Sequence, residues 1–171
     1  MRKPPKTPIP ADHASTIHAQ WNREMPDIDL DGARVLARAG RITLVARREI
    51  DAVFSRHGID AGEFYVLSAL RRAGPPFTMR PTEIYRSLMI SSGGLTDRLR
   101  RLEDAGLVRR RASGDDKRSL LVGLTEKGRR CVEAAFREDM ALENTIVSAL
   151  DAEERATLAQ LLQKLAASIG A

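Results

Sequence analysis

The sequence has almost no cysteine: Cys131 is the single one, so no disulfide can form within the chain. It also lacks any apolar run near the roughly 18 residues that a membrane-spanning helix needs. Its first ten residues, MRKPPKTPIP, are basic but have no apolar core of the kind that a signal peptide carries. We therefore expect a cytoplasmic protein with no membrane partner.

Motifs that carry catalysis are missing as well. The chain has no P-loop, no G-x-S-x-G sequence and no Cys/His spacing that suits zinc, since His13, His18 and His57 are scattered. Nothing around Cys131 indicates a lowered thiol pKa, so a packed thiol is favoured over a redox sensor. The sequence predicts that the protein is not an enzyme and uses no cofactor and no metal.

Positive charge is what the chain does have, and it is unevenly distributed. The net charge is +5, and the segment 98–118 alone holds eight basic and four acidic residues, a net +4. A charge run of this kind is often only a solvated face, but a local excess of Lys and Arg also suits a polyanionic partner such as DNA.

Residues 80–124 have the order of elements found in a DNA-binding motif. A helix is predicted from Pro81, which suits the first helical position, to residue 88. A second helix is predicted after Ser91, an N-cap residue, and Gly106 suits the position just past its end. Strands at 107–112 and 119–124 would form a hairpin. This order indicates a helix-turn-helix with a β-wing, and therefore a partner of double-stranded DNA.

Helical patterns continue on both sides of this motif. Start signals are Asp31 for a helix to residue 56, the pair Asp60 and Glu63, Thr125 for a helix to about residue 147, and the pair Asp151 and Glu154. A shorter helix is predicted at 12–25, where Pro26 ends it.

The flanking helices carry more apolar residues than a single winged helix can bury. We expect these apolar residues to be buried against those of a second copy, across a two-fold axis. The sequence predicts a mainly α-helical fold with a small β-wing, in which a winged helix-turn-helix is flanked by N- and C-terminal dimerisation helices. The expected boundaries are a flexible arm at 1–10, N-terminal dimerisation helices at 11–57, the DNA-binding domain at 60–124 and C-terminal dimerisation helices at 125–171.

The second helix of the motif presents two different faces. At 3.6 residues per turn, Leu95, Leu99 and Leu102 share a side that must face the core. The other side and the helix start are expected to contact DNA, through Ser91, Ser92, Gly93, Gly94, Thr96, Arg100 and Arg101. The tip of the wing would add Asp116, Lys117 and Arg118 in the minor groove. The alternative is a solvated helix face and a polar hairpin turn.

Arg98 differs from these arginines because it lies on the flank of the leucine stripe. We expect its side chain to turn back toward the body of the protein. A semi-buried arginine needs a carboxylate or an anionic ligand as its partner.

The segment SGGLTDRLRRLEDAGLVRRRASGDDKRSLLVGLTEKG, residues 92–128, resembles the MarR family of winged-helix regulators, and the similarity extends over about residues 31–169. The resemblance implies a homodimer that binds a palindromic operator and regulates genes, usually as a repressor, until a small ligand or an oxidant releases it. The alternative is a DNA-binding accessory protein that tolerates many sequences and senses nothing.

A subgroup, the urate-responsive MarR regulators with an added N-terminal helix, is similar in more detail. This resemblance implies that Trp21 and Arg98 contribute to a ligand pocket. Tyr65 stands where that subgroup has an aspartate, a departure that weighs against urate itself, since a tyrosine can instead stack on or donate to a phenolic or aromatic acid. The expected effector is therefore a small aromatic or anionic molecule. Trp21 has a second interpretation, as a residue that only packs the dimer.

Overall fold

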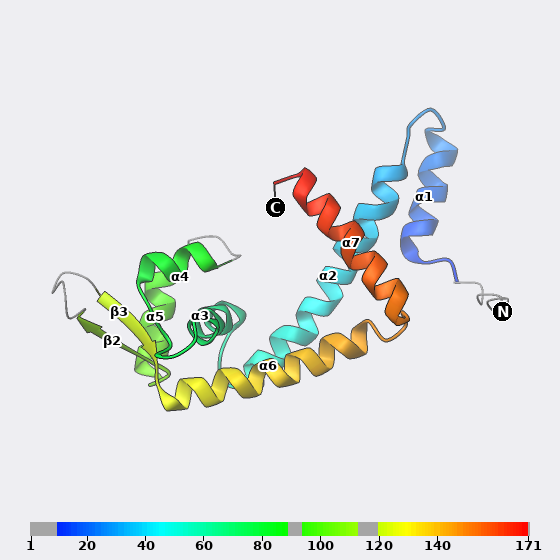
Figure 1. Ribbon diagram of the computed structural model, residues 1–171. Coiled ribbons are helices and arrows are strands. Elements are labelled where there is room, and N and C mark those ends of the chain that lie inside the picture. Colours follow the sequence, from blue (N-terminus) through cyan, green and yellow to red (C-terminus); the bar gives the residue numbers. More distant parts are fainter. Residues whose placement is uncertain (1–9, 89–93, 113–119, 171) are drawn as a thin grey trace. The chain divides into compact units, whose positions relative to one another are not determined.

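The computed structural model describes residues 10–88, 94–112 and 120–170. It shows a mainly helical chain with a small antiparallel sheet, as predicted (Figure 1). In chain order the elements are α1 (His13–Glu24), α2 (Asp31–Arg56), α3 (Ala61–Arg72), β1 (Thr78–Met79), α4 (Pro81–Ser87), α5 (Leu95–Asp104), β2 (Val108–Ala112), β3 (Leu120–Leu124), α6 (Glu126–Ile146) and α7 (Ala152–Ser168).

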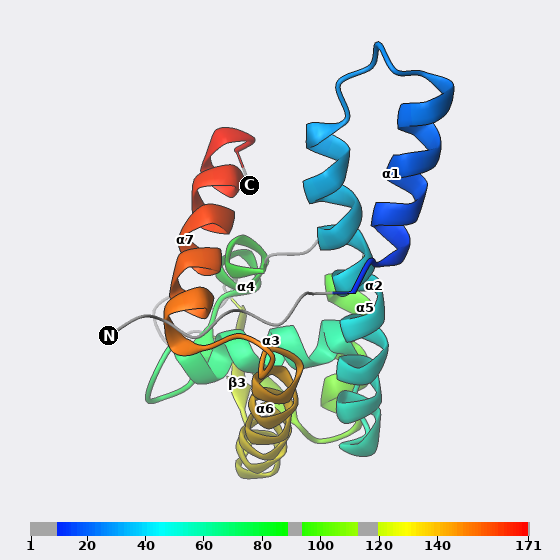
Figure 2. The same cartoon turned by 90° about the vertical axis from the view of Figure 1, so that its right-hand side faces the viewer.

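The chain forms two compact units, residues 1–47 and 48–171, and the boundary falls within α2. In the first unit α1 lies beside the N-terminal part of α2 (Figure 2). Asp12 caps α1 by accepting the Ser15 N–H at 2.8 Å, and it also accepts the Nε–H of Arg38 on α2 at 2.9 Å. Hydrogen bonds from Ser15, helped by Arg38, lower the pKa of Asp12 to about 2. This ionised carboxylate fastens the short helix to the long one.

Most predicted helix ends are confirmed, because they depend on residues within one turn. Gly58 adopts φ 72° just past α2, and the Ile59 N–H returns to the Phe54 carbonyl at 3.2 Å, which closes the helix end. Asp60 and Glu63 form a reciprocal capping box at the start of α3. Thr125 caps α6 in the predicted way, and Asp151 with Glu154 forms the same box at α7.

The prediction for the start of α2 was wrong in one detail. Asp31 is the first helical residue rather than the cap, and its N–H donates to the Asp29 carboxylate at 2.9 Å. Asp29, two residues earlier, therefore supplies the acceptor for a free backbone N–H at this helix end.

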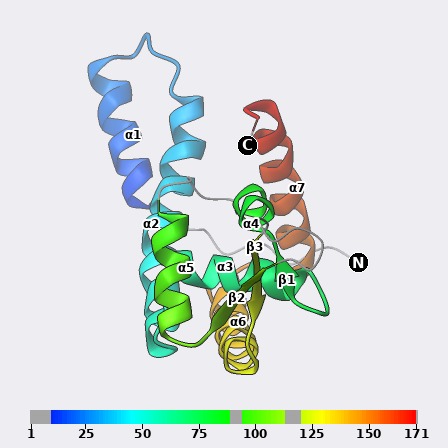
Figure 3. The same cartoon turned by 90° about the vertical axis from the view of Figure 1, so that its left-hand side faces the viewer.

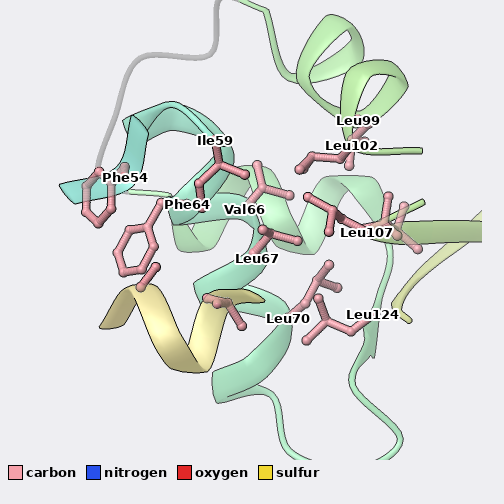
Figure 4. Close-up of a cluster of buried hydrophobic side chains, with 14 of the residues drawn as sticks. Phe54, Ile59, Phe64, Val66, Leu67, Leu70, Leu99, Leu102, Leu107 and Leu124 are labelled. Carbon is pink, nitrogen blue, oxygen red and sulfur yellow. The ribbon is translucent and has the colours of Figure 1, made fainter. Parts of the chain in front are cut away.

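Helix α3 is the centre of the second unit and contacts α4, α5, α6 and β3 (Figure 3). The rings of Phe54 and Phe64 stack with centroids 4.1 Å apart, and Leu67 and Leu70 are fully buried. Figure 4 shows these side chains pointing into one apolar cluster together with leucines from α5, from β3 and from the residue just before β2. Burial of this cluster holds the helix-turn-helix and the sheet in one body.

The sheet has the strand order β1–β3–β2, with every neighbour antiparallel. In the β2–β3 hairpin, Arg110 is opposite Val122 and Val108 is opposite Leu124. Both strands lie within one residue of the predicted ranges. The hairpin is the wing, although the turn that joins its strands lies outside the described residues.

The expected apolar stripes are present, but parts of them face solvent in the single chain. On α2 the stripe is buried at Val53, whereas Val35 is 55% and Ile42 61% exposed. Leu161 on α7 and Ile169 at its C-terminal end are likewise exposed. Exposed apolar surface of this extent is typical of an interaction face.

Candidate nucleic-acid interface

The helix-turn-helix consists of α4 and α5. Pro81 occupies the first position of α4, and Glu83 accepts the Arg80 N–H at 2.7 Å, which satisfies a free donor at that end. Ile84 is fully buried and anchors α4 on the core. On α5, Leu99 and Leu102 are buried and Leu95 is partly buried, so the predicted core face is confirmed.

The start of α5 differs from the prediction. The helix begins at Leu95, not after Ser91, because Gly94 adopts φ 91° and ψ 11°, a left-handed conformation that no helix interior contains. Ser91, Ser92 and Gly93 lie outside the described residues, so their predicted DNA contacts stay predictions. Thr96 and Gly94 are exposed at this end of the helix.

The C-terminal end of α5 is confirmed. Gly106 has φ 69°, and the Leu107 N–H donates to the Leu102 carbonyl at 2.8 Å. Leu107 itself is buried, so the chain enters β2 from a fixed direction.

Arg100 lies on the exposed face of α5, as expected. Its side chain is 64% exposed and its closest carboxylates are Asp104 at 3.6 Å and Asp97 at 3.9 Å. Surface pairs of this length are weak, so the guanidinium is available to a phosphate or a base edge.

Arg101 is 45% exposed, but its side chain also binds carboxylates at the start of α3, so its predicted DNA contact stays a prediction. Its Nε donates to Oε1 of Glu63 at 2.7 Å, and its Nη2 donates to Oδ2 of Asp60 at 2.8 Å. The remaining oxygens of both carboxylates complete the capping box of α3. The hydrogen bond to Glu63 raises the pKa of Arg101. Two charge-assisted bonds thus draw this side chain onto α3.

The spacing of Asp60 and Glu63 predicted only a capping box, which uses one oxygen of each carboxylate. The second oxygen of each carboxylate has no role in that box and can accept from a cation. That spare acceptor was the one sign in the sequence of the contact with Arg101.

Arg98 does turn back toward the body of the protein. It packs so closely on Gly62 of α3 that a Cβ added there would lie 2.3 Å from the Arg98 Nε. Its Nη1 is buried and has no hydrogen-bond partner among the described residues. A buried donor without an acceptor is costly, so this guanidinium has an unused capacity for an anion.

The wing adds further arginines. Arg109 and Arg111 are exposed on β2, on the face opposite Arg110, whose Nε lies 3.1 Å from Glu103 of α5. Arg110 therefore connects the wing to the C-terminal end of α5. The predicted tip residues Asp116, Lys117 and Arg118 lie outside the described residues.

The predicted ligand residues fall in different units. Trp21 belongs to α1 in the first unit and is 53% exposed. Tyr65 and Arg98 belong to the second unit, where the Tyr65 ring meets the edge of Phe64 with centroids 5.8 Å apart. A pocket shared by Trp21, Tyr65 and Arg98 stays a prediction.

The described part of the chain gives little support for a metal site or a reactive thiol. No group of three or more His, Cys, Asp or Glu side chains there could hold a metal ion. Burial raises the pKa of the Cys131 thiol, and its Sγ lies 3.7 Å from the His57 carbonyl, which fits a packed thiol. None of the described helices is long and apolar enough to cross a membrane.

Comparison with known proteins agrees with this geometry. A sequence profile of the MarR family matches residues 57–119. The chain is 37% identical over 151 residues to the HTH-type transcriptional regulator PecS of Dickeya dadantii, covering 88% of this chain and 91% of PecS. It is 32% identical over 131 residues to the multiple antibiotic resistance protein MarR of Salmonella typhimurium, covering 74% and 89%.

A solved structure is similar as well. The crystal structure of a mutant of MarR from E. coli complexed with operator DNA has a TM-score of 0.66 and 29% identity, covering 85% of this chain and 96% of that one. The chain therefore belongs to the MarR family of winged helix-turn-helix transcriptional regulators, which bind DNA and are not enzymes.

Proposed function

We propose that this protein is a homodimeric repressor that binds a palindromic operator and is released by a small aromatic or anionic ligand, in the manner of the urate-responsive subgroup. The observation that carries the DNA-binding part is the exposed face of α5 beside the wing, in a fold shared with a MarR protein solved on operator DNA. Gly94 and Thr96 lie at the helix start, where free N–H groups favour a phosphate, and Arg100 extends the same face.

A dimer accounts for the exposed apolar residues of α2 and α7. Val35, Ile42, Leu161 and Ile169 are all more than half exposed in the single chain. A two-fold interface would bury such residues against their equivalents in a second copy. It would also supply two recognition helices, which a palindrome requires.

The ligand-responsive part is supported by Arg98. Its Nη1 is buried without a hydrogen-bond partner among the described residues, and the side chain extends from the recognition helix itself onto Gly62 of α3. An anion that accepts from this guanidinium would act directly on the helix that contacts DNA. A ligand with unequal affinity for the free and DNA-bound shapes would then shift the equilibrium between them.

The test is a titration of the protein against the DNA upstream of its own gene, at fixed salt, with an unrelated duplex of equal length as competitor. We expect a specific complex that urate, salicylate or a hydroxycinnamate dissociates. Equal affinity for both duplexes, with no response to any of the three, would favour the non-sensing accessory protein.

Arg100→Ala is expected to weaken operator binding because it removes an outward guanidinium without disturbing the core. The slope of log Kd against log salt should fall by about one unit for each phosphate that the variant no longer neutralises. Arg130→Ala is the matched control, since Arg130 is similarly exposed on α6. An unchanged slope for Arg100→Ala would show that this side chain meets only solvent.

Gly62→Ala is expected to block the ligand response while DNA binding persists. The new methyl group would occupy the position of the Arg98 guanidinium and displace it from α3. We expect the ligand concentration needed for release to rise by about tenfold or more, equivalent to ~1.4 kcal/mol. Gly40→Ala, at an open helical position, should leave that concentration as it is. Equal release from the Gly62 variant and the parent would exclude Arg98 from the ligand site.

A further inference from the structure

A basic hollow lies between α3 and α6, on side chains that neither the DNA interface nor the predicted ligand pocket uses. Its volume is about 510 Å³, within the usual range for small-molecule sites. Its lining includes Ser68, Arg71 and Arg72 of α3 and Arg129, Phe136 and Arg137 of α6. The lining thus combines a strong positive charge, a hydroxyl group and an aromatic ring.

The positive charge is only partly balanced within the hollow. Glu133 is the single carboxylate of the lining, and it meets Arg71 at 2.7 Å, Arg129 at 3.1 Å and Arg137 at 4.0 Å. The hydrogen bond from Arg71 is the main cause that lowers the pKa of Glu133, so this carboxylate is ionised at neutral pH. Arg129 has a second partner in Glu126, at 2.8 Å. One carboxylate therefore organises several guanidinium groups without neutralising them.

Three of these arginines keep free donors. Arg71 reaches Glu133 through its Nε, and its guanidinium is held over the Phe77 ring at 5.1 Å. Within the described residues, both of its terminal nitrogens are left for another acceptor. Arg72 donates only to the Ser68 carbonyl, at 3.4 Å, and has no ion pair among the described residues. Arg137 is 75% exposed, with Glu133 at the limit of ion-pair distance. Guanidinium groups with paired free donors fit phosphate oxygens.

The lining also has an apolar part, on the same helix α6 that carries Arg129 and Arg137. Phe136 is 49% exposed there, beside the buried Val132. An exposed phenyl ring next to phosphate-binding groups offers a stacking surface to a planar base, an interaction that tolerates different bases.

We propose that this hollow binds a nucleoside diphosphate, with the phosphates on Arg71, Arg72 and Arg137 and the base against Phe136. Four arginines and one glutamate give the lining itself a net charge of +3, and Glu126, which binds Arg129 from outside the lining, lowers the local balance to +2. This positive charge still favours a diphosphate group, whose last proton has a pKa near 6 and whose charge is roughly −3. The ligand would connect α3, which contacts the recognition helix, to α6. Its binding should therefore stabilise the second unit.

The test uses the full chain without DNA, so it does not depend on the proposed operator binding. ADP and GDP are titrated by calorimetry and by thermal unfolding, with adenosine and inorganic phosphate in parallel. We expect at least one diphosphate to bind and to raise the melting temperature, with each fragment binding more weakly. Arg72→Ala and Phe136→Ala should each weaken that binding about tenfold or more, whereas Arg130→Ala, outside the hollow, should not.

Other outcomes overturn the proposal. Absence of ADP and GDP binding, or binding that both variants retain, would exclude this site. If Phe136→Ala instead dissociates the dimer, the hollow belongs to the subunit interface. If Arg72→Ala weakens only operator binding, the arginines serve DNA phosphates.

Discussion

Gly128→Ala is expected to destabilise the protein by about 3 kcal/mol, at the upper end of overpacking effects. A Cβ at Gly128, in the first turn of α6, would lie 1.9 Å from the Leu107 carbonyl oxygen and 2.8 Å from its carbon. Both are backbone atoms of a buried residue, and the same oxygen accepts the Thr125 N–H at 3.1 Å. This residue cannot move aside without breaking the connection between α5, the wing and α6.

Urea unfolding and thermal unfolding measure this effect. For a chain of this size the melting temperature should fall by roughly 10 °C, and operator affinity should fall with it near that temperature. Gly40→Ala is the control, because no atom lies within 4 Å of a Cβ there and alanine favours a helix interior over glycine. Equal stability of the Gly128 variant and the parent would mean that α6 can shift away from Leu107.

The elements that the sequence predicted well are those fixed by neighbouring residues. The turns at Gly58 and Gly106 need a left-handed residue just past a helix, and the box of Asp60 with Glu63 needs two side chains three residues apart. Such signals act within one helical turn. They also place the leucine stripe of α5 on the core, because its spacing follows the helix period.

The start of α5 was predicted wrongly because two local signals compete there. Ser91 is a good cap by residue type, but glycine populates left-handed conformations without the steric cost that other residues bear. Gly94 adopts one, and the helix begins after it. Residue type alone does not decide between a cap residue and a glycine that follows within a few positions.

The directions of the arginine side chains on α5 could be predicted only in part. Helical angles placed Arg98 toward the body of the protein and Arg100 toward solvent, and both directions are observed. The same angles placed Arg101 outward, yet its partners Glu63 and Asp60 lie 38 and 41 positions earlier in the chain. Only the docking of α5 on α3 brings these groups together. A long arginine side chain can reach such partners from a position that a helical wheel assigns to solvent.

Arg101→Ala is therefore expected to weaken operator binding by changing the position of the recognition helix rather than by removing a bond to a DNA phosphate. Without its guanidinium, the buried Glu63 loses its cation and α5 loses its attachment to the first turn of α3. We expect operator affinity to fall about tenfold, which corresponds to a typical coupling between residues in direct contact. The slope against log salt should stay unchanged, since the number of counterions released from DNA stays the same.

Glu63→Gln isolates the same interaction from the other side, because glutamine can still accept the Asp60 N–H while it cannot form an ion pair with Arg101. It should reproduce the loss of affinity, and the double variant should be little worse than either single one. Arg100→Ala combined with Glu63→Gln should instead be additive. A reduced salt slope for Arg101→Ala, with normal binding by Glu63→Gln, would show that Arg101 leaves its carboxylates and contacts DNA itself. In that case α5 would keep its position on α3 through the leucine stripe and the packing of Arg98 on Gly62.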